Sequence, residues 1–287
     1  MFNPTEVVIH SFQEAIKQYY LSNYSSLEPN FPGILSYVTR MSLEIIANSD
    51  APYHDVNHTI MVTLVGQEIL RGMHLKDGGV TPNDWMHFTI SLLCHDIGYV
   101  RGICQNDGDG NYVINSRNET ITLPPGATDA ALTPYHVERG KIFVQERFAG
   151  NKYIDVDAIC ANIEYTQFPV PRLQVSQNRT AFPAFLRAAD LIGQMADPNY
   201  MRKISALFFE FQETGMNEKL GYKTPACLRS NYPMFFRKMV MPHVGSALHY
   251  LQMTQEGKQW IANLYSHIFS EEYNLPSLGC ERTASVA

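Results

Sequence analysis

Residues 52–73, PYHDVNHTIMVTLVGQEILRGM, join two histidines to a long apolar run. From His58 onward the run shows no strand-like alternation and predicts a buried helix. If that helix includes the residues before it, His54 and His58 lie one turn apart on the same face. Such a pair adds nothing to the stability of a soluble helix, so it is either incidental or part of a site.

Apolar residues recur at helical spacing along most of the remaining chain. The clearest start is at residues 81–99, where Thr81 is a cap, Pro82 takes the first helical position and Asp84 lies in the first turn; Gly98 is the expected stop. Further helices are expected at residues 6–21, 34–47, 134–148, 156–166, 183–196, 200–213 and 257–269. The pattern predicts an all-α fold.

Residues 101–133 interrupt the helical pattern. NDGDGN at 106–111 and PPGATD at 124–129 enclose a short stretch of mixed polarity, which predicts a long loop insertion with one small hairpin. Loops of this length usually cover a site or are disordered. A second loop is expected at 167–180, and a disordered tail from about Leu278. Without repeats or linkers, residues 1–287 are predicted to form a single domain.

The composition excludes several kinds of partner. The chain is 45% hydrophobic and 17% charged, enough apolar material for a sizeable core. Its formal net charge is −6 and it has no basic run, which argues against nucleic acid or an anionic membrane as the main partner. A phosphate-ester substrate would therefore need a local cation to attract it.

The cysteines and the first residues favour a cytoplasmic protein. Five cysteines are scattered, without a C-x-x-C pair, which suits a reduced compartment with most of them as small core residues. The start lacks the basic and apolar regions of a secretory signal, and no uncharged apolar run reaches the length of a membrane span. A homo-oligomer is compatible with these features.

Four side chains carry metal-binding chemistry. His58 follows the opening motif, His95 and Asp96 are adjacent at a helix end in LLCHDIGY, and Asp190 lies in the apolar helix AFLRAADLIGQM. A carboxylate between alanine and leucine should be paired or bound to a cation, because burying it alone is costly. Imidazoles with carboxylates suit Zn²⁺, Fe, Mn²⁺ or, with more water, Mg²⁺. Each signal is weak alone, but their order along the chain is distinctive.

This order, H…HD…D, resembles the signature of the HD superfamily of metal-dependent phosphohydrolases, and in particular the catalytic domain of cyclic-nucleotide phosphodiesterases. PYHDVNHT is similar to the family's Y-H-N-x-x-H-A, YHVERGKIF to H-H-x-x-x-G-F, IEYTQF to A-T-D-M, LRAADLIGQMADP to H-C-A-D-L-S-N-P, and RSNYPMFFRKMVMPHV to S-Q-V-G-F-I-x-x-I-V-x-P. The resemblance covers about residues 35–270. It implies a multi-helix phosphodiesterase-like bundle with this segment as the catalytic core.

The resemblance also implies the chemistry. His58, His95, Asp96 and Asp190 would hold one divalent metal ion, and Asp96 would also bridge to a second ion or to the attacking hydroxide. His54 would be the general acid that protonates the leaving ribose oxygen. The expected reaction is hydrolysis of a 3′,5′-cyclic nucleotide by a metal-activated hydroxide.

Further candidates carry alternatives. His136 either ligates a second ion or supports the first ligands by hydrogen bonding, and Glu164 either binds water on a second ion or is solvated. Arg187 could pair a carboxylate or a substrate phosphate. The substrate contacts implied by the resemblance are Tyr53, Asn231 in the place of the purine-clamping glutamine, and Phe235 or Phe236 as the stacking aromatic. Where the family has a further histidine after the HD pair, this chain has Tyr99, Val100 and Arg101.

Three rival functions use the same residues. A 5′-nucleotidase or other small phosphomonoesterase keeps the metal and changes the substrate. A di-iron HD oxygenase needs more histidine ligands than can be placed with certainty. A non-catalytic nucleotide-binding module would have no need of His54, His58, His95, Asp96 and Asp190 together, because folding does not require all five.

Overall fold

Helices account for most of the computed structural model, which describes residues 2–167 and 182–273. The helix α4 (Pro82–Cys94) begins as predicted, because Thr81 and Asp84 exchange side-chain-to-backbone hydrogen bonds in a capping box. It ends at Cys94, before the expected stop at Gly98, which instead lies in the short turn η1 (Ile97–Tyr99). The all-α prediction is confirmed. The second predicted loop and the tail lie almost entirely outside the described residues.

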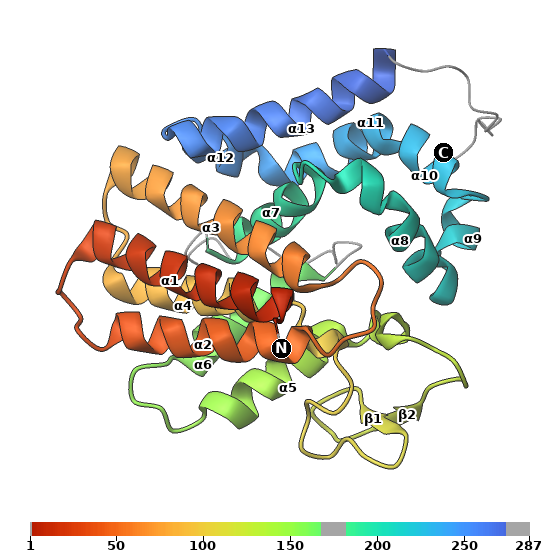
Figure 1. Cartoon of the computed structure of the whole chain (residues 1–287), viewed down its shortest axis with the longest axis horizontal. Coiled ribbons are helices and arrows are strands. Elements are labelled where there is room, and N and C mark those ends of the chain that lie inside the picture. Colours follow the sequence, from red (N-terminus) through yellow and green to blue (C-terminus); the bar gives the residue numbers. More distant parts are fainter. Residues whose placement is uncertain (1, 168–181, 274–287) are drawn as a thin grey trace.

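The other helices and helical turns, in chain order, are α1 (Pro4–Tyr24), α2 (Phe31–Ile46), α3 (Val56–Asp77), η2 (Asp129–Leu132), α5 (His136–Phe148), α6 (Val156–Ile163), η3 (Glu164–Thr166), α7 (Phe182–Met195), α8 (Tyr200–Glu213), α9 (Met216–Leu220), α10 (Pro225–Ser230), α11 (Tyr232–Phe235), the π-helical turn η4 (Phe236–Val240), α12 (Met241–Leu251) and α13 (Gln255–Tyr273). One apolar core includes residues from Ile9 in α1 to Ile268 in α13. Figure 1 shows α12 and α13 along the top of the molecule, with α1 and α2 below them. Within the described residues, no helix has the length and apolar character that crossing a membrane requires.

The predicted insertion contains the predicted hairpin, visible at the lower right of Figure 1. Strand β1 (Asn111–Val113) pairs antiparallel with β2 (Thr120–Thr122). Arg139 of α5 is fully buried and ties this insertion to the bundle. Its guanidinium donates to the carbonyl oxygens of Gly98, Val100 and Val113 and to the carboxylate of Asp107. The insertion is thereby fixed to the segment that follows the HD pair.

Glycine allows a close crossing of α3 and α7, which share an extensive interface. A Cβ on Gly193 of α7 would stand 2.8 Å from the Cα and 2.9 Å from the backbone nitrogen of Val62 on α3. Both atoms belong to the helix backbone, so they cannot move aside as a side chain can. Asp190 lies one turn before Gly193, and His58 one turn before Val62. The crossing therefore sets the separation of two predicted metal ligands.

We expect Gly193→Ala to lower the free energy of unfolding by about 1–3 kcal/mol, because the added methyl group forces the two helices apart. The same shift should weaken metal binding by moving Asp190 from His58. Chemical denaturation and metal titration measure the two effects. The control is Gly245→Ala in α12, where no atom lies within 4 Å of the added Cβ and no loss is expected. Equal stability of the two variants would contradict this explanation.

Candidate metal centre

The segment before α3 and the first turn of that helix supply two histidines. Asp55 caps α3, because its carboxylate accepts a hydrogen bond from the His58 backbone N–H at 2.8 Å. The helix begins at Val56, so His54 lies before it. The expectation that both histidines share one helix face is wrong. Their rings are nevertheless neighbours, with centroids 5.3 Å apart.

The end of α4 supplies the HD pair. His95 follows Cys94 as the C-cap, and its Nδ1 donates a hydrogen bond to the Leu92 carbonyl oxygen at 2.8 Å. A carbonyl oxygen can only accept, so the proton is on Nδ1 and the neutral ring keeps a lone pair on Nε2. Asp96 comes next and begins η1. The helix end therefore presents an imidazole lone pair and a carboxylate side by side.

Gly98 brings the HD segment against the start of α5. A Cβ at this position would stand 1.8 Å from the His136 carbonyl oxygen and 2.7 Å from the Gly140 backbone nitrogen, so a side chain does not fit. The close approach places His136 beside the HD pair, with its Nε2 3.8 Å from Oδ1 of Asp96. The glycine that was expected to stop a helix thus serves to pack two segments closely.

Four donor atoms from α3, the end of α4 and α7 converge. His58 Nε2 lies 3.2 Å from Asp96 Oδ2 and 3.3 Å from Asp190 Oδ1. His95 Nε2 lies 3.0 Å and 3.7 Å from the same two oxygens. Two ligand atoms that are each ~2.1 Å from one ion, at about 90–109° to one another, lie roughly 3.0–3.4 Å apart. The observed separations are close to those of ligands that share one cation.

Several of the converging atoms have no hydrogen-bond partner in the described part of the chain. These are Nε2 of His58, Nε2 of His95 and Oδ2 of Asp96, all buried. Leaving a buried polar atom unsatisfied costs about 1–3 kcal/mol. A cation bound by these lone pairs would remove that cost. The residues therefore fit a divalent metal ion. Among the described residues, two overlapping groups could each hold one, His54 with His58 and Asp96, and His58 with His95 and Asp190; these are the metal-competent groups.

The cluster attracts positive charge, and one of its four side chains is partly exposed. Burial opposes a charge on His58, but the neighbouring carboxylates of Asp190 and Asp96 outweigh it and raise the pKa of His58 to about 10. Despite its burial, Asp96 has a pKa well below its usual range because of His95 and His58. The side chain of Asp190 is 21% exposed, against 8% for Asp96, 2% for His58 and 0% for His95, so Asp190 is the most exposed of the four.

A buried glutamate of α8 orients His54. Glu210 is 2% exposed, and its Oε2 accepts a hydrogen bond from His54 Nδ1 at 2.6 Å. Its Oε1 accepts from the backbone N–H groups of Tyr53 and His54 at 2.7 and 3.1 Å. Burial lowers the pKa of His54, but the charge of Glu210 and this hydrogen bond outweigh it, and the net pKa is raised. With Nδ1 engaged, Nε2 is the His54 nitrogen left for a bound molecule.

Tyr99 packs between two histidines of the site. Its ring stacks on His54 with centroids 4.4 Å apart and on His136 with centroids 4.6 Å apart. The tyrosine is 3% exposed. The tyrosine holds the two imidazoles in place by stacking. Neither Tyr99 nor Glu210 was predicted as part of the site.

The two secondary candidates, His136 and Glu164, differ in their position relative to the cluster. His136 lies at the cluster: its Nδ1 donates to the Thr133 carbonyl oxygen at 2.6 Å, and burial lowers its pKa. Its Nε2 therefore keeps a lone pair toward Asp96, which suits either a second ion or a supporting position. Glu164 is engaged elsewhere, because its carboxylate lies 2.5 Å from Lys141 Nζ. It belongs to neither of the metal-competent groups of the described residues.

The three predicted substrate contacts have partners within the protein. Tyr53 is 2% exposed and its ring packs behind His58, with centroids 5.4 Å apart. The Asn231 amide donates to the Tyr222 hydroxyl. Phe235 packs against the main apolar core. Contact of these residues with a nucleobase stays a prediction.

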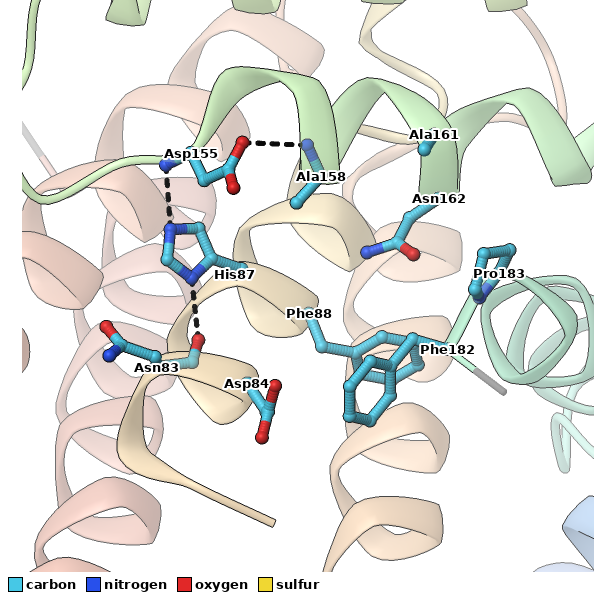
Figure 2. A pocket seen from close by; sticks show the side chains of 10 residues that line it. All are labelled: Asn83, Asp84, His87, Phe88, Asp155, Ala158, Ala161, Asn162, Phe182 and Pro183. Carbon is cyan, nitrogen blue, oxygen red and sulfur yellow. Dashed lines mark hydrogen bonds between the residues drawn. The ribbon is translucent and has the colours of Figure 1, made fainter. Parts of the chain in front are cut away.

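A separate hollow of about 600 Å³ lies between α4, α6 and the start of α7, as Figure 2 shows. Both ring nitrogens of His87 in this hollow are used: Nδ1 donates to the Asn83 carbonyl oxygen, and Nε2 accepts from the Asp155 backbone N–H. The hollow is lined by Asn83, Asp84, His87, Phe88, Asp155, Ala158, Ala161, Asn162, Phe182 and Pro183. None of these residues belongs to the metal-competent groups, so the hollow is distinct from the centre.

An all-α bundle with a buried histidine–aspartate cluster defines a class of candidate metalloproteins. The chain is matched over residues 2–274 by the family model described as Npun_R2479-like. It belongs to this family, since the match includes nearly the whole sequence. No curated protein and no solved structure matches it.

Proposed function

We propose that this protein is a metal-dependent phosphohydrolase of the HD superfamily and that its substrate is a 3′,5′-cyclic nucleotide. One observation carries the proposal: in the H…HD…D pattern, Nε2 of His58 and Nε2 of His95 each lie 3.0–3.7 Å from an oxygen of Asp96 and from an oxygen of Asp190. His54 lies beside them and is backed by a buried carboxylate. A phosphoester hydrolase needs a cation site and an acid, and these contacts support the assignment of the cluster and of His54 to the two roles.

The donor set suits Zn²⁺, Fe, Mn²⁺ or Mg²⁺, held by His58, His95, Asp96 and Asp190. Such an ion would activate water and offset the negative charge that builds up on the phosphoryl oxygens. The 3.8 Å separation of Asp96 Oδ1 and His136 Nε2 supports the proposal that these two atoms would bind a second ion. The second ion, like the first, is part of the proposal.

His54 would carry out the proton transfer. Water adds to phosphorus as the bond to the ribose oxygen breaks, and this oxygen leaves poorly as an alkoxide. The protonated His54 ring, held through Nδ1 by Glu210, would donate its Nε2 proton to the leaving oxygen. The raised pKa of His54 keeps the acid form populated to higher pH than for a free histidine.

The test is an activity assay with defined metals. The protein is stripped by a chelator, reloaded with Mn²⁺, Mg²⁺, Zn²⁺ or Fe²⁺, and incubated with cyclic AMP, cyclic GMP and a panel of 5′-nucleotides. We expect metal-dependent conversion of a cyclic nucleotide to its 5′-monophosphate. Release of inorganic phosphate from 5′-nucleotides alone would replace this substrate with a phosphomonoester. The absence of turnover with every metal and every phosphate ester would overturn the proposal.

A further inference from the structure

An arginine lies one helical turn from a candidate metal ligand and has a guanidinium nitrogen without a partner. Arg187 precedes Asp190 by three residues on α7, so both side chains lie on the same side of the helix. Arg187 Nε donates to the Tyr165 carbonyl oxygen at 2.6 Å, and the guanidinium lies over the Tyr165 ring, 5.0 Å from its centroid. Its Nη2 is buried and has no hydrogen-bond partner in the described residues.

Other cations on the segments that flank the centre are already paired with carboxylates: Arg101 with Asp50 and Asp129, Arg139 with Asp107, and Lys141 with Glu138 and Glu164. No carboxylate of the described residues lies within ion-pairing distance of Arg187. Burial lowers the pKa of Arg187, although Tyr165 and Asp190 oppose this effect. An arginine nevertheless stays charged at physiological pH. Arg187 is therefore a partly desolvated cation with no paired carboxylate among the described residues.

Arg187 lies one helical turn from the most exposed candidate ligand. Asp190 is the most exposed of the four candidate ligands, with 21% of its side chain accessible. The charge of Arg187 also reaches His243 of α12, a helix that packs on α7; burial lowers the pKa of His243 and this charge lowers it further. Arg187 therefore contributes positive charge between α7 and α12 and interacts electrostatically with Asp190.

We propose that Arg187 binds an anionic group of the substrate, a phosphoryl group by preference, through its unpartnered Nη2. This inference rests on the proposed function, since it assigns the anion recognised at that same centre. With a formal net charge of −6, the chain as a whole repels anions. Arg187 supplies the local cation that the sequence requires for a phosphate-ester substrate, and it selects anionic esters over neutral ones.

The test measures binding of inorganic phosphate to the metal-loaded protein by calorimetry. In Arg187→Gln we expect the Kd for phosphate to rise roughly 10- to 100-fold, because a charge-assisted hydrogen bond is lost. Metal content should stay at the wild-type level. Arg202→Gln is the matched control, as it removes one charge from an exposed arginine of α8 and should leave the Kd unchanged. Arg187→Lys keeps the charge but not the planar guanidinium with its two parallel N–H donors, so it should give an intermediate Kd for phosphate.

The outcomes separate this inference from the proposed reaction. A purely structural role of Arg187, as the link from α7 to Tyr165, predicts a lower Tm in Arg187→Gln with an unchanged Kd for phosphate. That result would overturn the inference, and so would a lack of phosphate binding by the wild type. If Arg187→Gln does not fold, an unchanged Kd for phosphate in Arg187→Lys would overturn it instead. Arg187-dependent phosphate binding without turnover of any ester would support the anion site and defeat the reaction. Turnover of an ester, with KM and the Kd for phosphate unchanged in the variants, would support the reaction and defeat the anion site.

Discussion

Replacing Asp190 by alanine is expected to remove most of the bound metal and all of the phosphohydrolase activity. The cluster has two carboxylates to neutralise a divalent cation, and the Asp190 oxygen lies 3.3 Å from His58 Nε2 and 3.7 Å from His95 Nε2. Loss of a residue that only supports a ligand already costs about 10- to 100-fold in metal affinity, so loss of a ligand should cost at least about 100-fold. Metal analysis of the dialysed protein measures the effect directly.

The control for this variant is Asp157→Ala, which removes an exposed carboxylate from the first turn of α6. Its metal content should equal that of the wild type. Thermal unfolding in the presence of a chelator shows whether Asp190→Ala still folds, since without metal the two proteins should unfold at similar temperatures. Full metal content in a folded Asp190→Ala protein would mean that the four side chains do not share an ion.

The sequence predicted the helices from local patterns, and the four candidate ligands from short motifs whose order along the chain resembles that of a known superfamily. The start of α4 was readable from Thr81 and Asp84, whose capping interactions join residues three apart. The prediction that His54 shares a helix face with His58 was wrong, because the capping residue of α3 is Asp55, an equally local signal. An aspartate directly before a long apolar run could have indicated the correct helix start.

The hydrogen bond between His54 and Glu210 could not be predicted from a local sequence pattern. Glu210 lies 156 residues from His54 in sequence and stands among Phe208, Phe209 and Phe211, a stretch typical of core packing. Nothing in the local pattern distinguishes a buried carboxylate with a distant partner from a solvated one. The same holds for Tyr99, whose stacking on two histidines depends on how the HD segment packs against α5.

His54→Ala is expected to retain the metal and to slow the reaction by roughly 100-fold or more, as expected for loss of a general acid. This result distinguishes His54 from Asp190, although both have atoms near the same cluster. Metal content and kcat are measured on the same preparation. Equal loss of metal in His54→Ala and Asp190→Ala would show that His54 is a ligand, and the proposed division between metal binding and proton transfer would be wrong.

Glu210→Gln tests the same proton transfer through its pH dependence. His54 must be protonated to act as the acid, so the rate should fall as the pH rises through its pKa. Burial lowers this pKa and Glu210 raises it by more. Glutamine removes the negative charge, so the fall should begin at lower pH, with a loss of roughly 10- to 100-fold at pH values where the wild type is still active. The metal content should not change, because Glu210 is not in the metal-competent groups.

Glu213→Gln is the matched control for the pH profile. Glu213 lies one turn further along α8, and its carboxylate accepts hydrogen bonds from the Thr128 backbone N–H and hydroxyl at 2.7 Å rather than from His54. Its profile should coincide with that of the wild type, since the pKa of His54 depends on the charge next to its ring. A Glu210→Gln profile that fell at the same pH as the wild type would mean that a group other than His54 limits the reaction at high pH. Because each protein is measured with the same metal, the contribution of the cation to the pKa of His54 is common to all three, and the difference between profiles reports Glu210 alone.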